Sequence, residues 1–253
     1  DVLPKIGRLE IGQVDKTTVR GLLAPIASRA PVMANRLLAM LSSMLSFAEA
    51  EGYIDINPVL RMRKFVAEAP RERVLDDDEL RAVWLAADTI GYPWGPLTKL
   101  AILTGARRDE LAGMRWSEVD PAQRLWTIAR TRTKSDRAHV VPLEDLGLAV
   151  LATLPRDHDL VFTTTGRTGV SGFSKALRQL HAKSGVDGWS FHDLRRTFRT
   201  NLSRLRVMRD VAEMLIGHTR SGLLQVYDRY EFLDEKREGV ERHGAFVRNL
   251  VTD

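Results

Sequence analysis

The chain has 253 residues, 44% of them hydrophobic and 28% charged, which is enough apolar material for one large or two modest globular domains. Its formal net charge of +5 and sequence pI of about 9.7 fit a polyanionic partner. It contains no cysteine, which excludes disulfides, thiolate zinc sites and cysteine nucleophiles.

The sequence shows neither a membrane span nor a secretory signal. No apolar run approaches the roughly 20 residues that a spanning helix needs, and no basic stretch followed by an apolar one opens the chain. We therefore expect no membrane partner. Because the chain starts at Asp1 and not at methionine, we expect a fragment or a processed product, from which an N-terminal domain can be missing.

Two helices are predicted near the N-terminus. Residues 31–52 carry apolar side chains at steps of three and four, and Gly52 suits the left-handed residue that ends a helix. A shorter helix is predicted over residues 16–28, with Pro25 as a kink or an end. This part of the chain reads as a small helical bundle.

A linker separates this bundle from the remainder. Residues 65–84 have mixed charges and no periodicity until Asp76 and Glu79, spaced as a capping box, start a new helix. We place the boundary near residue 72, which predicts domains over residues 1–72 and 73–253.

The second domain begins with helices and then changes period. Residues 124–130 and 139–143 are rich in β-forming side chains, and the polar residues 131–138 between them predict a hairpin with Lys134 in its turn. Helical patterns return from about residue 171. The predicted fold is mainly α with a small antiparallel β-sheet, in which a helical domain precedes a mixed α/β domain.

The stretch "LTGARRDEL" (103–111) predicts a corner between two helices. Gly105 can end the first helix, and the acids after Arg107 suit the positive N-terminal end of the second. The pattern is typical of a corner with solvated arginines. It also fits a phosphate-binding Arg107 held by Glu110 one turn away.

The stretch "SFHDLRRTFRTNL" (190–202) predicts a basic helix that Ser190 and Asp193 cap. His192 and Arg195 fall one turn apart on one face. The histidine can be a structural residue of an amphipathic helix, but a DNA backbone explains the arginine density better than solvation does. The arginines of this region are Arg195, Arg196, Arg199, Arg204, Arg206 and Arg209.

Residues 208–218 predict another helix, which Gly217 ends so that His218 lies just beyond it. The next segment carries Tyr227 and Tyr230 among apolar residues. A buried tyrosine is usually a core residue with a hydrogen-bonded hydroxyl. These motifs contain neither paired carboxylates nor the spacing of metal ligands, so we expect no metal and no cofactor.

Taken in order, these residues resemble the tyrosine recombinases of the phage integrase family, and the prophage and genomic-island integrases in particular. The family's TG-x-R-x-x-E-L box is matched by Thr104, Gly105, Arg107, Glu110 and Leu111. Its H-x-x-R box is matched by His192 and Arg195, and its G-H box with a tyrosine nine positions later by Gly217, His218 and Tyr227. The resemblance implies that residues 1–72 are a core-binding, DNA-binding domain and residues 73–253 the catalytic domain.

The resemblance also implies a role for each matched residue. Tyr227 is the expected nucleophile, with Tyr230 as its packing neighbour, and Lys134 the expected donor of a proton to the leaving 5′ oxygen. The remaining roles fall to two arginines and two histidines: phosphate binding by Arg107 and Arg195, a hydrogen bond to the phosphate from His218, and proton removal from the tyrosine by His192. Glu110 is expected to support the site, and DNA contacts are expected from Arg137, Arg196 and Arg199.

By the same resemblance, the expected function is site-specific DNA recombination through a 3′-phosphotyrosyl intermediate, which integrates or excises a mobile element. Expected partners are double-stranded DNA, further copies of the chain in a tetramer on paired sites, and accessory DNA-bending or directionality proteins. The expected location is the cytoplasm of a bacterium, at the nucleoid, with the chain encoded by a bacterium or a phage.

Three other functions stay open at this point. A type IB topoisomerase uses nearly the same active-site residues to relax supercoils, and a degenerate relative can bind DNA without cutting it. A metal-dependent hydrolase built on His192 and His218 fits least, because few acids lie near either residue.

The C-terminal residues 231–251 have charged and apolar side chains at helical spacing. They can form a helix that packs on its own catalytic domain. The family resemblance implies the alternative, in which such a tail docks on a neighbouring protomer and couples active sites.

Overall fold

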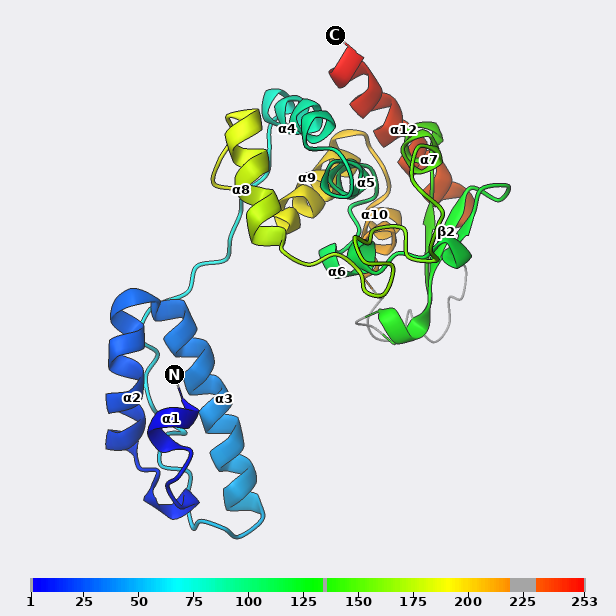
Figure 1. Cartoon of the computed structure of the whole chain (residues 1–253). Helices are drawn as coiled ribbons and strands as arrows, with labels where there is room; N and C mark the ends of the chain where they lie inside the picture. The colour runs from blue at the N-terminus through cyan, green and yellow to red at the C-terminus, as the bar shows by residue number, and fades with distance from the viewer. Residues whose placement is uncertain (1, 134–135, 219–230, 253) are drawn as a thin grey trace. The chain divides into compact units, whose positions relative to one another are not determined.

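The computed structural model describes residues 2–133, 136–218 and 231–252, and the chain divides into two compact units, Asp1–Arg71 and Glu72–Asp253. Figure 1 shows the helices of each unit packed around a centre of their own.

The first unit is a helical bundle. Its elements are α1 (Leu3–Ile6), the 3-10 helix η1 (Ile11–Gln13), α2 (Lys16–Arg29) and α3 (Pro31–Ala50). Helices α2 and α3 pack on each other through buried leucines such as Leu23 and Leu41. The two predicted helices are confirmed, but α2 does not end at Pro25, because its buried face continues through Ile26.

Two buried asparagines attach the rest of this unit to α3. Asn35 on α3 accepts a hydrogen bond from the backbone N–H of Phe65 at 2.7 Å and donates to the oxygen of Val66 at 2.8 Å. Asn57, in the loop after α3, donates to the oxygen of Ser42 at 2.8 Å. Asn57 also accepts from the backbone N–H of Val59 at 2.9 Å, so each amide satisfies backbone groups of the segment that follows α3 and attaches this segment to the helix.

The second unit is mainly helical with one small sheet, so the predicted fold class is confirmed. Its helices are α4 (Asp77–Ile90), α5 (Trp94–Thr104), α6 (Arg108–Ala112), α7 (Asp145–Ala152), α8 (Phe173–Ser184), α9 (Phe191–Arg204), α10 (Arg209–Leu215) and α12 (Leu233–Thr252), with 3-10 turns η2 (Trp116–Glu118) and η3 (Arg130–Arg132). The capping box predicted at the start of α4 is present: the N–H of Asp76 donates to Glu79 at 3.0 Å, and the N–H of Glu79 to Asp76 at 2.9 Å.

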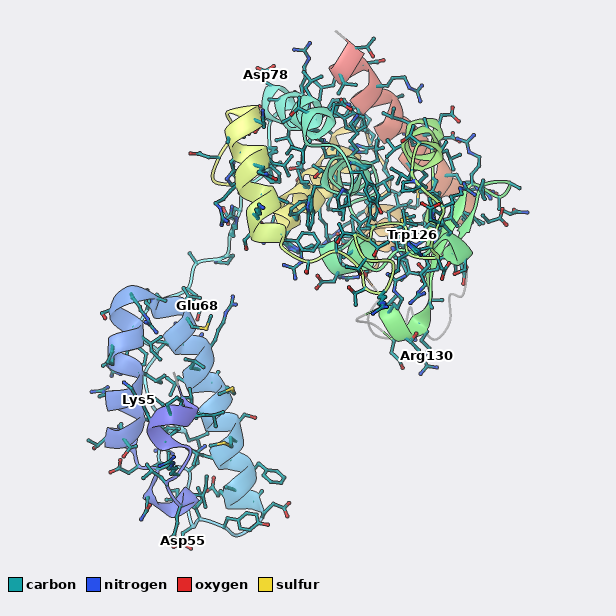
Figure 2. The ribbon with its side chains drawn as sticks, in the orientation of Figure 1. Lys5, Asp55, Glu68, Asp78, Trp126 and Arg130 are labelled. Carbon is teal, nitrogen blue, oxygen red and sulfur yellow. The ribbon has the colours of Figure 1, made fainter. Side chains whose placement is uncertain are left out.

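The sheet is antiparallel in the order β1-β2-β3, with strands Val119–Asp120, Leu125–Ile128 and His139–Pro142. Ile128 pairs with His139, which confirms the predicted hairpin strands. Trp126 on β2 is fully buried and anchors the sheet in the core (Figure 2), whereas Arg130 lies at the exposed end of the hairpin. The turn residue Lys134 lies outside the described residues.

Helix α5 is the centre of the second unit, since most of its residues are buried and it packs on α4, α7, α9 and α12. Helix α12 lies against α4, α5, α7, α9, α10 and β3 (Figure 1) and buries Val240, His243 and Val247. The expectation that the tail packs on its own domain is therefore confirmed for this helix. Docking of the tail on a neighbouring protomer stays a prediction.

Candidate active site

The corner between α5 and α6 places Arg107. Gly105 ends α5 in the left-handed conformation, with φ of +59°, which favours glycine. A side chain here would also place its Cβ 2.3 Å from Cδ1 of Phe198. Because Gly105 turns the chain so tightly, Arg107 becomes the residue that precedes α6, as the sequence predicted.

Arg107 is held by two fixed groups. Its backbone N–H donates to Glu110 at 2.8 Å, and its Nη1 donates to the other oxygen of the same carboxylate at 2.7 Å. Glu110 is 3% exposed, so the carboxylate of this ion pair is shielded from water, whereas the Arg107 side chain stays partly exposed. The Nη2 of Arg107 donates to the main-chain oxygen of Gly217 at 3.3 Å.

Arg195 on α9 is buried and points to the same place. Its Nη1 donates to the oxygen of Gly105 at 3.0 Å, and its Nη2 donates to the oxygen of Ile216. Burial and the neighbouring Arg107 lower the pKa of Arg195 to about 10. The guanidinium is therefore still charged at neutral pH, and its orientation is set by backbone groups from two distant loops.

His192 lies one turn before Arg195, at the start of α9. Ser190 begins this helix, with its N–H and its hydroxyl both donating to Asp193 at 2.8 Å. Burial, followed by the charges of Arg196 and Arg195, lowers the pKa of His192 below its ordinary value. The imidazole is thus mainly neutral at pH 7 and can accept a proton.

Gly217 and His218 follow α10. Gly217 has φ of +68°, and its carbonyl is the acceptor for Arg107. Glu213 on α10 lies 2.6 Å from Nδ1 of His218, and the backbone N–H of His218 donates to the oxygen of Glu213 at 2.9 Å. The exposed ring is therefore oriented through Nδ1, which leaves Nε2 for a ligand.

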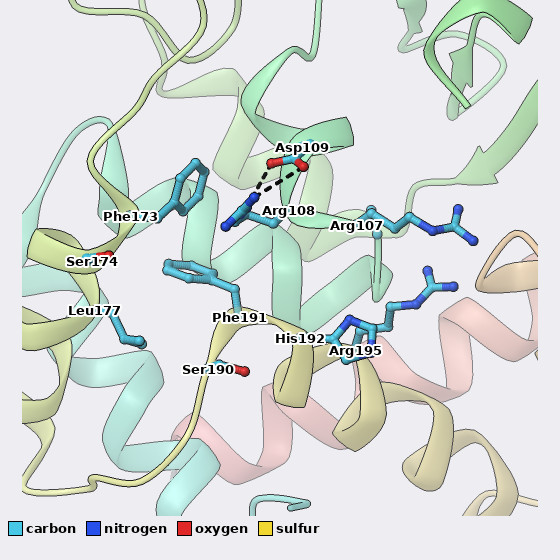
Figure 3. A pocket seen from close by; sticks show the side chains of 11 residues that line it. Arg107, Arg108, Asp109, Phe173, Ser174, Leu177, Ser190, Phe191, His192 and Arg195 are labelled. Atoms are coloured by element: carbon cyan, nitrogen blue, oxygen red, sulfur yellow. Dashed lines mark hydrogen bonds and ion pairs between the residues drawn. The ribbon is translucent and has the colours of Figure 1, made fainter. Parts of the chain in front are cut away.

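A pocket of about 370 Å³ lies over this cluster. Figure 3 shows the side chains of Arg107 and Arg195 extending side by side, with His192 beside them. Its other side is aromatic, formed by Phe173 and Phe191. The full lining is Ala106, Arg107, Arg108, Asp109, Phe173, Ser174, Leu177, Ser190, Phe191, His192 and Arg195.

The chemistry of this cluster suits an anion. Within residues 2–133, 136–218 and 231–252, no group of three histidine or acidic side chains could hold a metal ion. Two fixed guanidinium groups with donors in a planar fork match the oxygens of a phosphate.

Among the residues that the structure describes, no helix combines the length and the hydrophobicity that crossing a bilayer requires.

The other predicted residues differ in their placement. Arg196 pairs with Asp193, and Arg199 donates to Glu213 at 2.9 Å, so both have acidic partners. Arg137 is exposed after the hairpin turn. Lys134, Tyr227 and Tyr230 fall outside the described residues, so their predicted places in the site stay predictions.

His139, which the sequence did not single out, also belongs to this region. It is the first residue of β3, and its ring lies beside Gly217 and Arg107. In the sequence it is only the first residue of a predicted strand. The contact depends on β3 and the loop after α10 meeting in the fold, which no local pattern reports.

Comparison with known proteins places the chain in a family. Residues 73–233 match the phage integrase family, and residues 1–65 match the phage integrase central domain. The chain belongs to the phage integrase family, and the resemblance seen in its motifs is confirmed. It is 25% identical over 248 residues to the prophage integrase IntA of Escherichia coli strain K12, an alignment that covers 94% of this chain and 60% of IntA. The chain thus spans about 60% of the length of that relative.

Solved structures share the fold at lower identity. A lambda integrase (75–356) dimer bound to a COC′ core site aligns with a TM-score of 0.64 and 21% identity, over 83% of this chain and 81% of that chain. A lambda integrase tetramer bound to a Holliday junction aligns with a TM-score of 0.65 and 21% identity, over 86% of this chain and 67% of that chain. At 21% identity, the similarity to these solved structures shows a shared fold and nothing beyond the fold.

Proposed function

We propose that this chain is the DNA-cleaving and DNA-rejoining part of a site-specific tyrosine recombinase, which integrates or excises a mobile element. The observation that supports it best is the convergence of Arg107 and Arg195, each fixed by its own partners, with His192 in one pocket. Family membership supplies the reaction class, and the pocket supplies groups suited to it.

The reaction begins when the hydroxyl of Tyr227 attacks the scissile phosphate. A 3′-phosphotyrosyl bond forms and the bond to the 5′ oxygen breaks, so the energy of the broken phosphodiester is kept in the new one. A 5′ hydroxyl from the same or another duplex then attacks the phosphotyrosine. No ATP is consumed, and the tyrosine is regenerated.

The cationic groups stabilise charge on the phosphate as it reacts. Arg107 and Arg195 bind its non-bridging oxygens, and because both guanidiniums are held in place beforehand, they need little reorganisation. His218 donates a further hydrogen bond through Nε2, while Glu213 holds its other nitrogen.

Two proton transfers complete the step. An ordinary phenol has a pKa of ~10, so Tyr227 needs a base, and neutral His192 takes that role. Lys134 protonates the leaving 5′ oxygen. Glu110 keeps Arg107 oriented throughout, through its two hydrogen bonds.

The partner of this site is double-stranded DNA. We assign DNA binding to residues 1–72 as a core-binding domain and catalysis to residues 73–253, with Arg137, Arg196 and Arg199 as further DNA contacts. The lambda integrase structures contain a dimer on a core site and a tetramer on a Holliday junction, which supports assembly of this chain into a tetramer on paired sites. Such a recombinase acts in the bacterial cytoplasm, at the nucleoid, with accessory DNA-bending or directionality proteins.

Trapping the covalent intermediate tests this proposal. The chain's core site is first selected from a random duplex pool by binding, and the selected duplex is then nicked so that the cleaved strand diffuses away. We expect wild type to form a covalent adduct, in the presence of a chelator, and Tyr227→Phe to form none while binding the same duplex. Tyr53→Phe is the control, because Tyr53 is 68% exposed in the first unit. An unchanged adduct yield with Tyr227→Phe would overturn the proposal.

A further inference from the structure

His139 shares one small space with Arg107. A Cβ placed on Gly217 would lie 3.3 Å from Nη1 of Arg107, and 3.2 Å and 3.3 Å from Cδ2 and Nε2 of His139. The Nε2 edge of the imidazole and the guanidinium therefore border the same point, which only a residue without a side chain leaves open. The pairing of His139 with Ile128 in the sheet fixes the backbone position from which the imidazole ring extends.

The ring is surrounded by charge from three helices. Glu110 on α6 and Arg107, which directly precedes α6, both act on the ring. Arg195 on α9 and Lys236 on α12 are its other charged neighbours. The pKa of His139 is lowered to about 4, mainly by burial, with Lys236, Arg107 and Arg195 acting in the same direction and Glu110 opposing them. At neutral pH the imidazole is therefore uncharged, with one N–H donor and one acceptor nitrogen.

Within residues 2–133, 136–218 and 231–252, the ring of His139 makes no hydrogen bond. The side chain is half-buried, and neither of its nitrogens belongs to the fully buried polar atoms that lack a partner, so the ring edge stays open to a ligand. Lys236 is 5% exposed; burial lowers the pKa of its ammonium, and the nearby charge of Glu231 raises it. A neutral imidazole whose Nε2 edge borders the same point as the Arg107 guanidinium can donate to an oxygen of the ligand that Arg107 binds.

We propose that His139 is a further phosphate-binding residue of the active site, whose Nε2–H donates a hydrogen bond to a non-bridging oxygen of the DNA phosphate held by Arg107 and Arg195. This inference rests on the proposed recombinase function and adds one contact to it. Because the imidazole is neutral, it adds a donor next to Arg107 without adding another positive charge to an already cationic cluster.

Three substitutions separate a hydrogen bond from simple space filling. In His139→Gln the amide nitrogen reaches roughly the position of Nε2, in His139→Asn it reaches that of Nδ1, and His139→Leu has no donor. We expect Leu and Asn to slow covalent adduct formation ~10- to 100-fold and Gln to keep it within ~3-fold of wild type. A space-filling role predicts the opposite order, with Leu closest to wild type.

A modified substrate makes the contact itself visible. Duplexes in which one or the other non-bridging oxygen of the scissile phosphate is replaced by methyl remove each acceptor in turn. On the duplex that lacks the oxygen bound by His139, wild type and His139→Leu should react at equal rates. On the other duplex, the defect of His139→Leu should persist.

Controls distinguish failure of the role proposed for His139 from failure of the proposed recombinase function. Thermal unfolding and binding of the unmodified duplex show whether each variant folds; if His139→Leu does not, Gln and Asn carry the comparison. A wild-type rate in His139→Asn, or a Gln variant as slow as Asn, overturns the assignment of His139. Absence of any adduct with wild type, or its persistence in Tyr227→Phe, instead overturns the proposed function.

Discussion

Arg195 donates a hydrogen bond from Nη1 to the main-chain oxygen of Gly105, which lies 90 residues earlier in the chain, at 3.0 Å. The other end of the same guanidinium donates to the oxygen of Ile216. One buried side chain thus ties together the loop that carries Arg107 and the loop that carries His218. The three separate motifs of the sequence meet through this residue.

Replacing Arg195 by lysine should therefore stop cleavage while keeping the positive charge. An ammonium cannot donate to two carbonyls and to a phosphate in the fixed planar geometry of a guanidinium. We expect adduct formation to fall roughly 100-fold or more. The measurement is single-turnover cleavage of the nicked duplex. Arg167→Lys, at an exposed loop position, should match wild type, and a mild effect of Arg195→Lys would contradict this role.

Glu110→Gln should weaken the hold on Arg107. The amide keeps one acceptor oxygen of the two that Arg107 uses, so we expect cleavage to slow ~10- to 100-fold. DNA affinity should stay equal or rise, because a negative charge beside the phosphate site is removed.

The matched control is Glu79→Gln. Glu79 occupies the same position in the capping box of α4 and pairs with Arg73, but it does not line the pocket. It should lower stability without slowing cleavage. Equal cleavage defects in both variants would show that loss of a capped helix, and not loss of Arg107 orientation, causes the effect.

Gly217→Ala should slow DNA cleavage by more than its loss of folding stability explains. The left-handed backbone alone costs about 1 kcal/mol for alanine, and the added Cβ would in addition press on Arg107 and His139. Gly185→Ala has nearly the same φ, +69°, and open space around the Cβ, so it carries the backbone cost alone. Urea unfolding and adduct rates, measured on both, should show similar losses of stability but a cleavage defect in Gly217→Ala only.

His243 should make the stability of the chain depend on pH. This residue of α12 is fully buried, its Nε2 lies 3.0 Å from the oxygen of Ile102, and burial lowers its pKa from 6.5 to about 4. Below pH 6.5 the unfolded chain binds a proton that the folded chain does not accept until about pH 4. The free energy of unfolding therefore falls as the pH drops through this window.

His243→Gln keeps a donor for Ile102 and removes the titration. Between pH 7 and pH 4.5, wild type should lose about 2 to 3 kcal/mol more stability than the variant, measured by urea unfolding. Parallel losses in the two proteins would mean that His243 is protonated without cost in the folded state. His139 adds to the dependence of both, because its pKa is lowered in the same direction.

The sequence predicts those features of the fold that depend on neighbours in the chain. The capping box of Asp76 and Glu79, the left-handed Gly105 and the start of α9 at Ser190 all follow from residues within one helical turn. Hairpin strands β2 and β3 follow from their β-forming residues. The two-residue strand β1 was not predicted, because so short a segment carries no periodic pattern.

Features that depend on distant residues could not be predicted in this way. Pro25 signals a helix end, but burial of Ile26 against α3 extends α2 past it. The contact between His139 and Gly217 joins a strand to a loop far along the chain, and nothing local to either residue indicates it. The motifs gave the identity of Arg107 and Arg195, whereas the fold shows what orients them.

The most direct test of the whole account is to identify the residue that becomes attached to DNA. Wild-type adduct on the nicked duplex is digested with protease and nuclease, and the nucleotide-bearing peptide is sequenced by mass spectrometry. The account predicts that the 3′-phosphate is carried by Tyr227. Attachment at Tyr230, or at any residue other than Tyr227, would contradict it.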